Sequence, residues 1–348
     1  MERRICRNSG LELSVLGTGC WTFGGGDYWG KQDQEDVDRV VKASVDNGIN
    51  YFDTAEAYNE GRSESSLGEA LQGIPRDKYL IGTKVSPSNC YRDQLISHCE
   101  ASLQRLRTSH IDIYMIHWPI HSHSIRHFTG DQEKIANPPG AEEALEALLL
   151  LKEQGKIRHI AVSNFSPARL QELPVSEIAV NQLPYNLLCR AIEYDTISYC
   201  SSNGIGIIGY MALMQGILTG KYSSFDSIPV MQRRTRHFSS LRTKEVRHGE
   251  AGAEEETREA LEKIKNISVA TGLSMNELAI RWVLKNSSVT CSLAGSRNRS
   301  QLEANIKTVA APLSSEIKEE LDKITQPLKQ KLGNHFDYYE NASNDRTL

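Results

Sequence analysis

The sequence predicts an α/β fold in which eight parallel strands close into a (β/α)8 TIM barrel. Short apolar or β-branched runs alternate with amphipathic segments along almost the whole chain, which is typical of parallel strands joined by crossover helices. Eight such runs fit within the 348 residues, a length suited to one barrel of this kind. The turn after the first run places Thr22 where a dinucleotide-binding G-x-G-x-x-G motif has its third glycine, which disfavours an open Rossmann sheet.

The expected barrel strands are short and spread evenly along the chain. They are Val15–Gly17, Ile49–Phe52, Tyr79–Thr83, Ile111–Ile116, Ile157–Val162, Ile178–Val180, Ile205–Gly209 and Val289–Leu293. Helical periodicity predicts helices between them, among them Glu35–Asn47, Arg92–Leu106, Ala141–Gln154 and Glu254–Ala270. Glycine closely follows three of these helices, at Gly48, Gly155 and Gly272, where it favours helix termination.

We expect a single domain, residues 1–348, with three additions to the barrel. Residues 1–14 contain a Ser-Gly turn and are expected to form a short hairpin that caps the barrel bottom. The long loop after the seventh strand, residues 223–252, is rich in Arg and Lys, so it is either a solvated charge run or a mobile lid over an anionic cofactor. The polar tail, residues 327–348, either frays or folds over the barrel mouth.

Composition excludes several classes of protein. A formal net charge of -4 gives no basic field for nucleic acid, and no apolar run is long enough to cross a membrane. The charged first residues lack the apolar centre of a secretory signal, and the seven scattered cysteines are odd in number without a C-x-x-C pair, so we expect a cytoplasmic protein. The choice between a monomer and a homo-oligomer stays open.

Polar residues end the expected strands, and in barrels of this kind active sites lie at those ends. Asp53 ends the second strand with Tyr58 five positions later, Lys84 ends the third and His117 ends the fourth. Any one of them alone is more often a helix cap, a surface charge or an ordinary loop residue. Together they suit one reaction, because a carbonyl that accepts a hydride becomes an alkoxide and requires a proton donor.

Tyr58 is the expected proton donor, but a tyrosine has an ordinary pKa of about 10. We expect the Lys84 ammonium to lower the pKa of Tyr58, and Asp53 to hold that ammonium in place. Neutral His117 is expected to hydrogen-bond the substrate oxygen. The histidines at 117, 121, 123 and 127 also invite a metal site, but no carboxylate or cysteine stands beside them in sequence, so we expect a substrate-facing loop and no metal.

The sequence resembles the aldo-keto reductase superfamily. The resemblance rests on Phe52–Tyr58 (FDTAEAY), Thr83–Val85, Asp112–Pro119 (DIYMIHWP), Ser163–Phe165 and Asn181–Asn186 (NQLPYN). It implies a catalytic tetrad of Asp53, Tyr58, Lys84 and His117. Family members that reduce steroid double bonds replace the histidine with glutamate, so His117 implies reduction of C=O.

By the same resemblance, a nicotinamide dinucleotide lies along one groove. Residues expected to contact it are Gly19, Cys20, Trp21, Ser163, Asn164, Gln182, Tyr210, Met211, Leu213, Gln215, Gly216, Lys221, Gly295, Ser296, Arg297, Gln301 and Asn305. Ser296 and Arg297, at a helix start, suit a 2′-phosphate, which predicts NADPH rather than NADH. The chain departs from the commonest family pattern because it has no lysine at Gly295.

Aromatic residues are expected to wall the substrate site: Trp21, Tyr28, Trp29 and Trp118. The predicted function is reduction of a small aldehyde or ketone to an alcohol with NADP(H), with Tyr58 as general acid and base. Two alternatives stay open. One is a cofactor-binding regulatory subunit resembling potassium-channel β subunits, and the other is an NADP-dependent sugar or polyol dehydrogenase.

Overall fold

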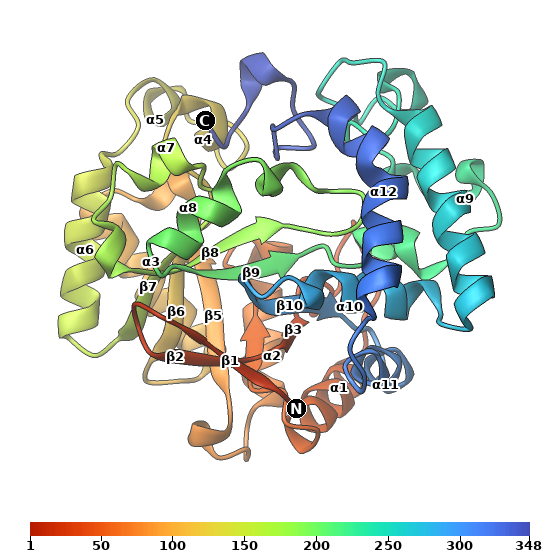
Figure 1. Cartoon of the computed structure of the whole chain (residues 1–348). Coiled ribbons are helices and arrows are strands. Elements are labelled where there is room, and N and C mark those ends of the chain that lie inside the picture. Colours follow the sequence, from red (N-terminus) through yellow and green to blue (C-terminus); the bar gives the residue numbers. More distant parts are fainter.

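The computed structural model describes residues 1–348, and at its centre eight parallel strands close into a barrel with the order β10-β3-β4-β5-β6-β7-β8-β9 (Figure 1). The strands are β3 (Leu16–Gly19), β4 (Tyr51–Asp53), β5 (Leu80–Val85), β6 (Ile111–Ile116), β7 (Ile157–Ser163), β8 (Ile178–Pro184), β9 (Gly206–Tyr210) and β10 (Val289–Gly295). The predicted barrel is therefore confirmed. The first and last of these strands, β3 and β10, pair with each other and complete the ring.

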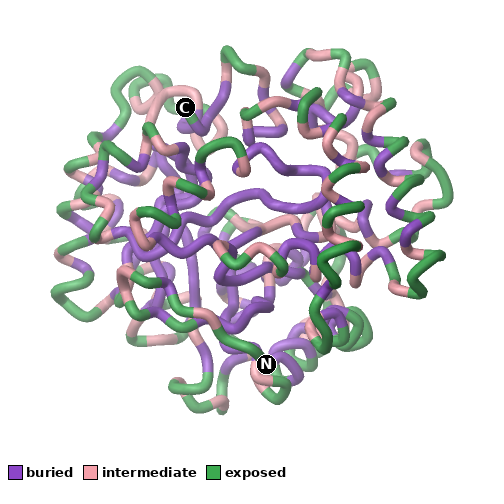
Figure 2. Tube along the Cα trace, viewed as in Figure 1, coloured by how far each residue is buried: buried purple, intermediate pink, exposed green.

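Helices surround the strands on the outside, as Figure 1 shows. They are α1 (Gln34–Asp46), α2 (Arg62–Ala70), α3 (Arg92–Leu106), α4 (Ser122–Ile125), α5 (Gln132–Ala136), α6 (Ala141–Glu153), α7 (Pro167–Leu170), α8 (Thr196–Ser202), α9 (Glu254–Thr271), α10 (Met275–Lys285), α11 (Arg299–Thr308) and α12 (Ser315–Leu332). Burial is concentrated at the strands and the inner faces of the helices, and the outer faces are exposed (Figure 2). This distribution follows from parallel strands being covered on both faces.

Most expected strands lie within two residues of the observed ones, but β8 is longer than predicted. It runs to Pro184, because Asn181 and Gln182 continue the strand although they interrupt the apolar run. Both amides are buried and hydrogen-bonded: Asn181 Nδ2 donates to the Phe165 carbonyl at 2.8 Å, and Gln182 Nε2 donates to an Asp53 carboxylate oxygen at 2.6 Å. A buried amide with partners is compatible with a barrel interior.

The expected N-terminal hairpin is present. It consists of β1 (Arg3–Cys6) and β2 (Leu11–Ser14), which pair antiparallel across the lower part of the molecule in Figure 1. Leu13 is fully buried in an apolar cluster with Tyr51, Ile113 and other inward-facing strand residues, so the hairpin closes the barrel floor.

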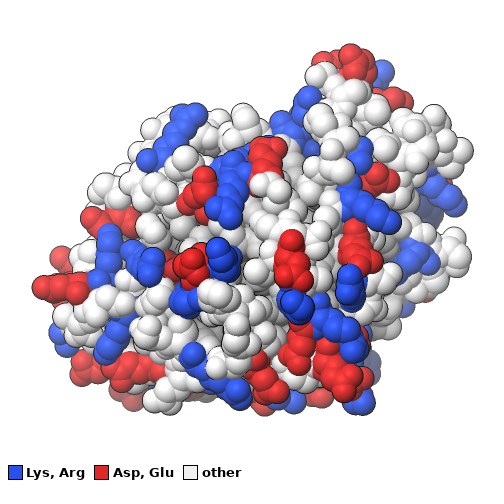
Figure 3. Space-filling view, turned by 90° about the horizontal axis from the view of Figure 1, so that it is seen from below, with Lys and Arg blue, Asp and Glu red and all other residues white.

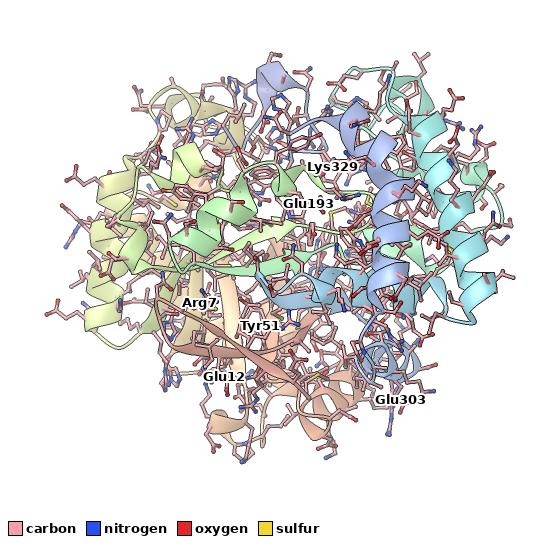
Figure 4. The ribbon with its side chains drawn as sticks, viewed as in Figure 1. Arg7, Glu12, Tyr51, Glu193, Glu303 and Lys329 are labelled. Atoms are coloured by element: carbon pink, nitrogen blue, oxygen red, sulfur yellow. The ribbon has the colours of Figure 1, made fainter.

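The C-terminal tail begins later than the sequence indicated, because α12 continues through Pro327 to Leu332. A proline inside a helix lowers its stability by about 3 kcal/mol, whereas burial of one leucine side chain stabilises the fold by about 1.5–3 kcal/mol. Leu328 and Leu332 are both buried, which is enough to offset the proline. An ion pair between Lys329 of α12 and Glu193, 2.8 Å long, also fixes this part of the helix (Figure 4).

The tail that follows α12 folds against the barrel mouth. Phe336 and Tyr338 are buried, and the Tyr338 hydroxyl accepts a hydrogen bond from the Ala191 N–H at 3.0 Å. His335, at the start of the tail, has its Nδ1 2.9 Å from a carboxylate oxygen of Asp345 near the end of the tail, and the Ser166 N–H donates to the Thr347 carbonyl. The tail therefore forms part of the wall at the mouth.

The loop after the seventh barrel strand, residues 223–252, lies beside the tail. Its only regular structure is three short 3-10 turns, at Phe225–Ser227, Val230–Gln232 and Ser240–Arg242. Phe238 is fully buried, Arg236 Nη2 donates to the Leu332 carbonyl at 2.8 Å, and Arg242 pairs with Glu254 at the start of α9 at 2.7 Å. These contacts tie the loop to α9 and α12.

The surface carries both signs of charge. Figure 3, which views the molecule from below, shows Lys and Arg interspersed with Asp and Glu, with no large area of one sign. None of the helices has both the length and the apolar character needed to cross a membrane. The seven cysteines are all buried free thiols.

If Leu13 closes the barrel floor, Leu13→Ala should leave a cavity and lower the free energy of unfolding by about 2–5 kcal/mol. Urea titration followed by circular dichroism measures this change. Ile5→Ala is the matched control, because Ile5 lies on the same hairpin and is 59% exposed. It should change stability by no more than about 0.5 kcal/mol. Equal effects of the two substitutions would contradict the packing role of Leu13.

Candidate active site

The four predicted catalytic side chains come from neighbouring strands. Asp53 is the last residue of β4, Lys84 lies near the end of β5, and His117 directly follows β6. Tyr58 begins a short 3-10 turn, Tyr58–Gly61, after β4. Because β4, β5 and β6 are adjacent and parallel, their carboxyl ends meet at one rim and bring the four side chains together.

Asp53 and Lys84 form a buried ion pair, with Lys84 Nζ 2.7 Å from Asp53 Oδ1. The ammonium also donates to the Thr54 carbonyl at 2.6 Å. The other carboxylate oxygen, Asp53 Oδ2, accepts hydrogen bonds from the Tyr51 hydroxyl at 2.9 Å and from Gln182 Nε2 at 2.6 Å. Burial of a charge is tolerated only when it is paired and hydrogen-bonded, and both charges here meet that condition.

A glycine of β5 makes room for this arrangement. A Cβ atom at Gly82 would overlap the Tyr51 hydroxyl, so only glycine lets that hydroxyl reach Asp53. The carboxylate therefore cannot rotate away from Lys84 without losing a hydrogen bond. Burial alone would lower the pKa of Lys84, but Asp53 and Tyr58 outweigh it, and the pKa of Lys84 is raised. The ammonium stays charged.

Tyr58 lies directly over this pair, with Lys84 Nζ 4.8 Å from the centroid of its ring. Burial raises the pKa of the Tyr58 phenol above its ordinary value, and the Lys84 charge opposes that rise without cancelling it. The Lys84 charge lowers the pKa of Tyr58, as expected, but the net shift is upward. Desolvation of the phenol, which the sequence does not reveal, is the larger effect.

His117 is buried next to Tyr58, with the two ring centroids 5.6 Å apart in an edge-to-face arrangement. Burial, with smaller contributions from the Lys84 and Arg346 charges, holds the pKa of His117 well below its ordinary value. The imidazole is therefore neutral at physiological pH, as expected. Its Nδ1 is buried without a hydrogen-bond partner. Its Nε2 also makes no hydrogen bond to the protein, so Nε2 is free to bind a ligand in the cavity.

The turn that carries Tyr58 has an uncommon backbone. Asn59 and Glu60 have φ of 51° and 58°, a region in which non-glycine residues are rare. Asn59 Nδ2 donates to the carbonyls of Trp21 and Phe23, at 3.0 Å and 2.8 Å, and this holds the turn against the loop after β3. The Trp21 ring then stacks beside Tyr58, with centroids 5.7 Å apart.

Three of the four predicted catalytic side chains, those of Asp53, Tyr58 and His117, face a cavity of about 850 Å³, which is within the usual range of small-molecule and cofactor sites. The predicted residues that line it are Gly19, Cys20, Trp21, Trp29, Asp53, Tyr58, His117, Trp118, Ser163, Asn164, Gln182, Tyr210, Met211, Leu213, Gln215, Gly216, Lys221, Gly295, Arg297, Gln301 and Asn305. Three others lie behind the wall: Lys84, Ser296 and Tyr28. Tyr28 stacks on Trp21, and its hydroxyl donates to Gln215 Oε1 at 2.7 Å.

One end of the cavity is built from the ends of β7, β8 and β9. Asn164 has a positive φ of 65°, its Nδ2 donates to the His117 carbonyl at 3.1 Å, and its Oδ1 accepts from the Tyr210 hydroxyl at 2.8 Å. Farther along, Gln215 and Gly216 have φ of 53° and 94°, and a Cβ at Gly216 would lie 2.7 Å from Lys221 Nζ. The backbone of this loop therefore lies close to the Lys221 ammonium. Backbone N–H groups next to a positive charge suit the binding of an anionic group such as a pyrophosphate.

The other end of the cavity lies at the start of α11. Arg297 bridges to the loop after β3: its Nη1 donates to the Trp29 carbonyl at 2.9 Å, its Nε to Gln32 Oε1 at 3.1 Å, and its Nη2 to the Lys31 carbonyl. The hydroxyl of Ser296 accepts from Asn305 Nδ2 at 3.0 Å. A guanidinium has five N–H groups, so two of those on Arg297 remain for a ligand. The residues present are compatible with a dinucleotide along the cavity.

Comparison with known proteins identifies the family of this barrel. The sequence pattern of the Aldo/keto reductase family matches residues 15–326. The chain belongs to the aldo/keto reductase family. This family member is 30% identical to aldo-keto reductase YhdN of Bacillus subtilis, over 94% of each chain. It is also 30% identical to the NADH-specific methylglyoxal reductase of Escherichia coli, over 87% of this chain and 92% of the other.

Among solved structures, the aldo/keto reductase barrel described above is similar to the glycerol dehydrogenase AKR11B4 of Gluconobacter oxydans. The TM-score is 0.73 at 28% identity, and the match covers 93% of this chain and 95% of the other. The shared fold extends over nearly the full length of both proteins.

Four long polar side chains that line the cavity of this aldo/keto reductase were not among the predicted site residues. They are Arg234 and Arg247, from the loop after β9, and Tyr339 and Arg346, from the C-terminal tail. The basic character of the loop was visible in the sequence, but its position was not. The sequence of the tail did not indicate that Tyr339 and Arg346 line the cavity, because a segment without hydrophobic periodicity does not show which surface it packs against.

The histidine-rich stretch of this family member does not form a metal centre in the structure. No group of three or more His, Cys, Asp or Glu side chains is arranged to hold a metal ion. His121 Nε2 instead lies 3.0 Å from the Arg346 carbonyl, and His127 lies 3.4 Å from a Glu340 carboxylate oxygen. These histidines therefore contact the C-terminal tail.

The raised pKa of Tyr58 can be tested without turnover. The difference in absorbance near 295 nm between wild type and Tyr58→Phe should show no phenolate until the pH exceeds about 10, the ordinary value. In Lys84→Met the opposing charge is lost, so the phenolate signal should move to still higher pH. The urea-unfolded proteins, which should titrate near the ordinary value, provide the control. A phenolate signal from folded wild type near pH 8 would contradict the assignment.

Proposed function

We propose that this protein reduces aldehydes or ketones to alcohols with NADPH, and that Tyr58 is the general acid. One observation carries the proposal: the Tyr58 phenol and a neutral His117 face the same cavity, directly above the buried pair of Asp53 and Lys84. Family membership and the aromatic lining from Trp21, Trp29 and Trp118 support it.

The reduced nicotinamide, when bound, supplies the hydride that adds to the carbonyl carbon. Asn164, Gln182 and Tyr210 lie at the end of the cavity next to the catalytic side chains and are suited to hold its ring. Gly216 and Lys221 suit its pyrophosphate, and Arg297, Gln301 and Asn305 suit its adenosine. Gln182 already donates to Asp53, so binding at this amide is linked to the position of the ion pair.

The protein side of the reaction is a proton transfer. Neutral His117 donates a hydrogen bond from Nε2 to the substrate oxygen and orients the carbonyl. Tyr58 gives its hydroxyl proton to the oxygen as negative charge develops there, and this completes the alcohol. The resulting phenolate lies beside the Lys84 ammonium, which stabilises it until solvent returns the proton.

The state of Tyr58 affects the rate in each direction, whereas the net direction depends on the cofactor ratio and the substrate. Because its pKa is raised, the phenol holds its proton at neutral pH and is ready to act as an acid. Oxidation of an alcohol requires the phenolate as the base, so its rate should rise at alkaline pH. The likeness to a glycerol dehydrogenase supports polyols as substrates of that reverse reaction. The seven free thiols support a reducing compartment such as the cytoplasm.

Replacement of the phenol tests the proposal. Tyr58→Phe should lower kcat for aldehyde reduction by about 10²–10⁴-fold and leave the dissociation constant of NADPH nearly unchanged, because only proton donation is lost. Stopped-flow absorbance at 340 nm and quenching of protein fluorescence measure the two quantities.

The matched control is Tyr114→Phe, which removes a buried hydroxyl that has no hydrogen-bond partner and lies outside the cavity. It should retain wild-type turnover. Normal turnover by Tyr58→Phe would exclude this residue as the acid. A wild-type protein that binds NADPH but reduces no carbonyl compound would favour a regulatory role instead.

The proposed preference for NADPH rests on Arg297. It requires its own test, since the NADH-specific methylglyoxal reductase of Escherichia coli is 30% identical to this chain. Arg297→Leu should weaken NADPH binding by about tenfold to a hundredfold, the range expected for a charged hydrogen bond, and weaken NADH binding much less. Arg299→Leu, an exposed neighbour paired with Glu303, is the control. Equal losses for both nucleotides would show that Arg297 only holds the loop at Trp29.

A further inference from the structure

The charges that line the cavity are strongly unbalanced. Five cationic side chains face it, and Asp53, already paired with Lys84, is the only carboxylate. Two of the cations, Lys221 and Arg297, lie where the proposed cofactor has its phosphates. The other three are Arg234, Arg247 and Arg346, which come from the loop after β9 and from the C-terminal tail. Their presence is not explained by reduction of a neutral carbonyl.

Arg346 is the most buried of the three, with 5% of the residue exposed. Its Nε and Nη2 donate to the two carboxylate oxygens of Asp337, at 2.6 Å and 2.7 Å, which fixes the plane of the guanidinium. The same group lies 3.8 Å from the ring centroid of Trp118, the residue after His117. Its Nη1 makes no hydrogen bond to the protein.

Arg234 and Arg247 also have uncommitted donors. Arg234 lies over the Tyr28 and Tyr339 rings, at 5.0 Å and 5.7 Å, has no carboxylate partner, and uses only Nε in a hydrogen bond. Arg247 uses only Nε, toward Glu340. Arg346 and Arg247 are each held by a carboxylate that lies outside the cavity lining, Asp337 and Glu340 respectively, so the directions of their N–H groups are fixed.

Guanidinium groups held in fixed planes bind carboxylate and phosphate through paired hydrogen bonds, and a concave site strengthens the attraction. We propose that Arg346, assisted by Arg234 and Arg247, binds an anionic oxygen group, a carboxylate or a phosphate, on the carbonyl substrate. Anionic aldehydes and ketones are then preferred over neutral ones of the same size. This inference rests on the proposed reductase function, because it names the substrate class of the same site.

The test compares matched pairs of substrates with wild-type protein and saturating NADPH. One pair is 5-oxopentanoate and pentanal, which differ by a carboxylate, and the other is glyceraldehyde 3-phosphate and glyceraldehyde, which differ by a phosphate. The value of kcat/KM should be about tenfold to a hundredfold higher for the anionic member of at least one pair, and the pair that responds identifies the group. The advantage should shrink as NaCl is raised, since salt screens charge.

Substitutions then assign the effect to the arginines. Arg346→Gln leaves the buried Asp337 carboxylate unpaired, so the double variant Arg346→Gln with Asp337→Asn is tested beside it, and Arg234→Gln provides a third variant. Each should lower the ratio of anionic to neutral kcat/KM by about tenfold. Lys244→Gln is the matched control, because it removes an exposed charge from the same loop without lining the cavity.

A readout without turnover accompanies the kinetics. Quenching of tryptophan fluorescence by 5-hydroxypentanoate, compared with pentanol, should reveal tighter binding of the anion, and Arg346→Gln with Asp337→Asn should abolish the difference. Equal kcat/KM for both members of each pair, with equal binding, overturns the inference and leaves the reductase function intact. Loss of NADPH affinity in the arginine variants, with an unchanged ratio, also overturns it and assigns the arginines to the cofactor. Turnover of no carbonyl at all overturns the proposed function itself.

Discussion

The buried ion pair between Asp53 and Lys84 is the interaction on which the rest of the site depends. Two charges without water are tolerated only when every remaining polar atom around them finds a partner. Tyr51, Thr54 and Gln182 supply those partners, and Gly82 leaves the space that one of them needs. The pair thereby fixes the relative positions of β4, β5 and β8, and it keeps a permanent positive charge beneath the Tyr58 ring.

The site divides its tasks between rigid and irregular parts of the chain. Asp53, Lys84 and His117 lie at or next to strand ends, where the barrel fixes side chains to within a narrow range of positions, and Tyr58 lies on the short turn that follows β4. The outer wall comes from the loop after β9 and from the C-terminal tail, which carry the arginines. This division is common in barrels of this kind, in which residues at the strand ends take part in the reaction and the loops above them differ between proteins and determine which ligand binds.

Much of this could be predicted from the sequence. The alternating pattern located all eight strands, because a buried parallel strand is a continuous apolar run. The motif around Tyr58 and the polar strand ends indicated which four side chains the barrel brings together at its rim. Features that depend on tertiary contacts were not predictable. The length of β8 depends on partners for Asn181 and Gln182, the path of α12 through Pro327 depends on two buried leucines, and the pKa of Tyr58 depends on how much water the fold removes.

The closure of the barrel has a consequence for how the protein is made. Strands β3 and β10 pair, although one is synthesised near the beginning of the chain and the other near the end. Until β10 emerges from the ribosome, β3 has an unsatisfied edge, which is a state prone to aggregation and one that chaperones protect. The cavity straddles this seam, since Gly19 and Gly295 both line it. A ligand that binds across this seam stabilises the closed barrel by mass action, because it binds the folded chain and not the chain in which β3 is still unpaired.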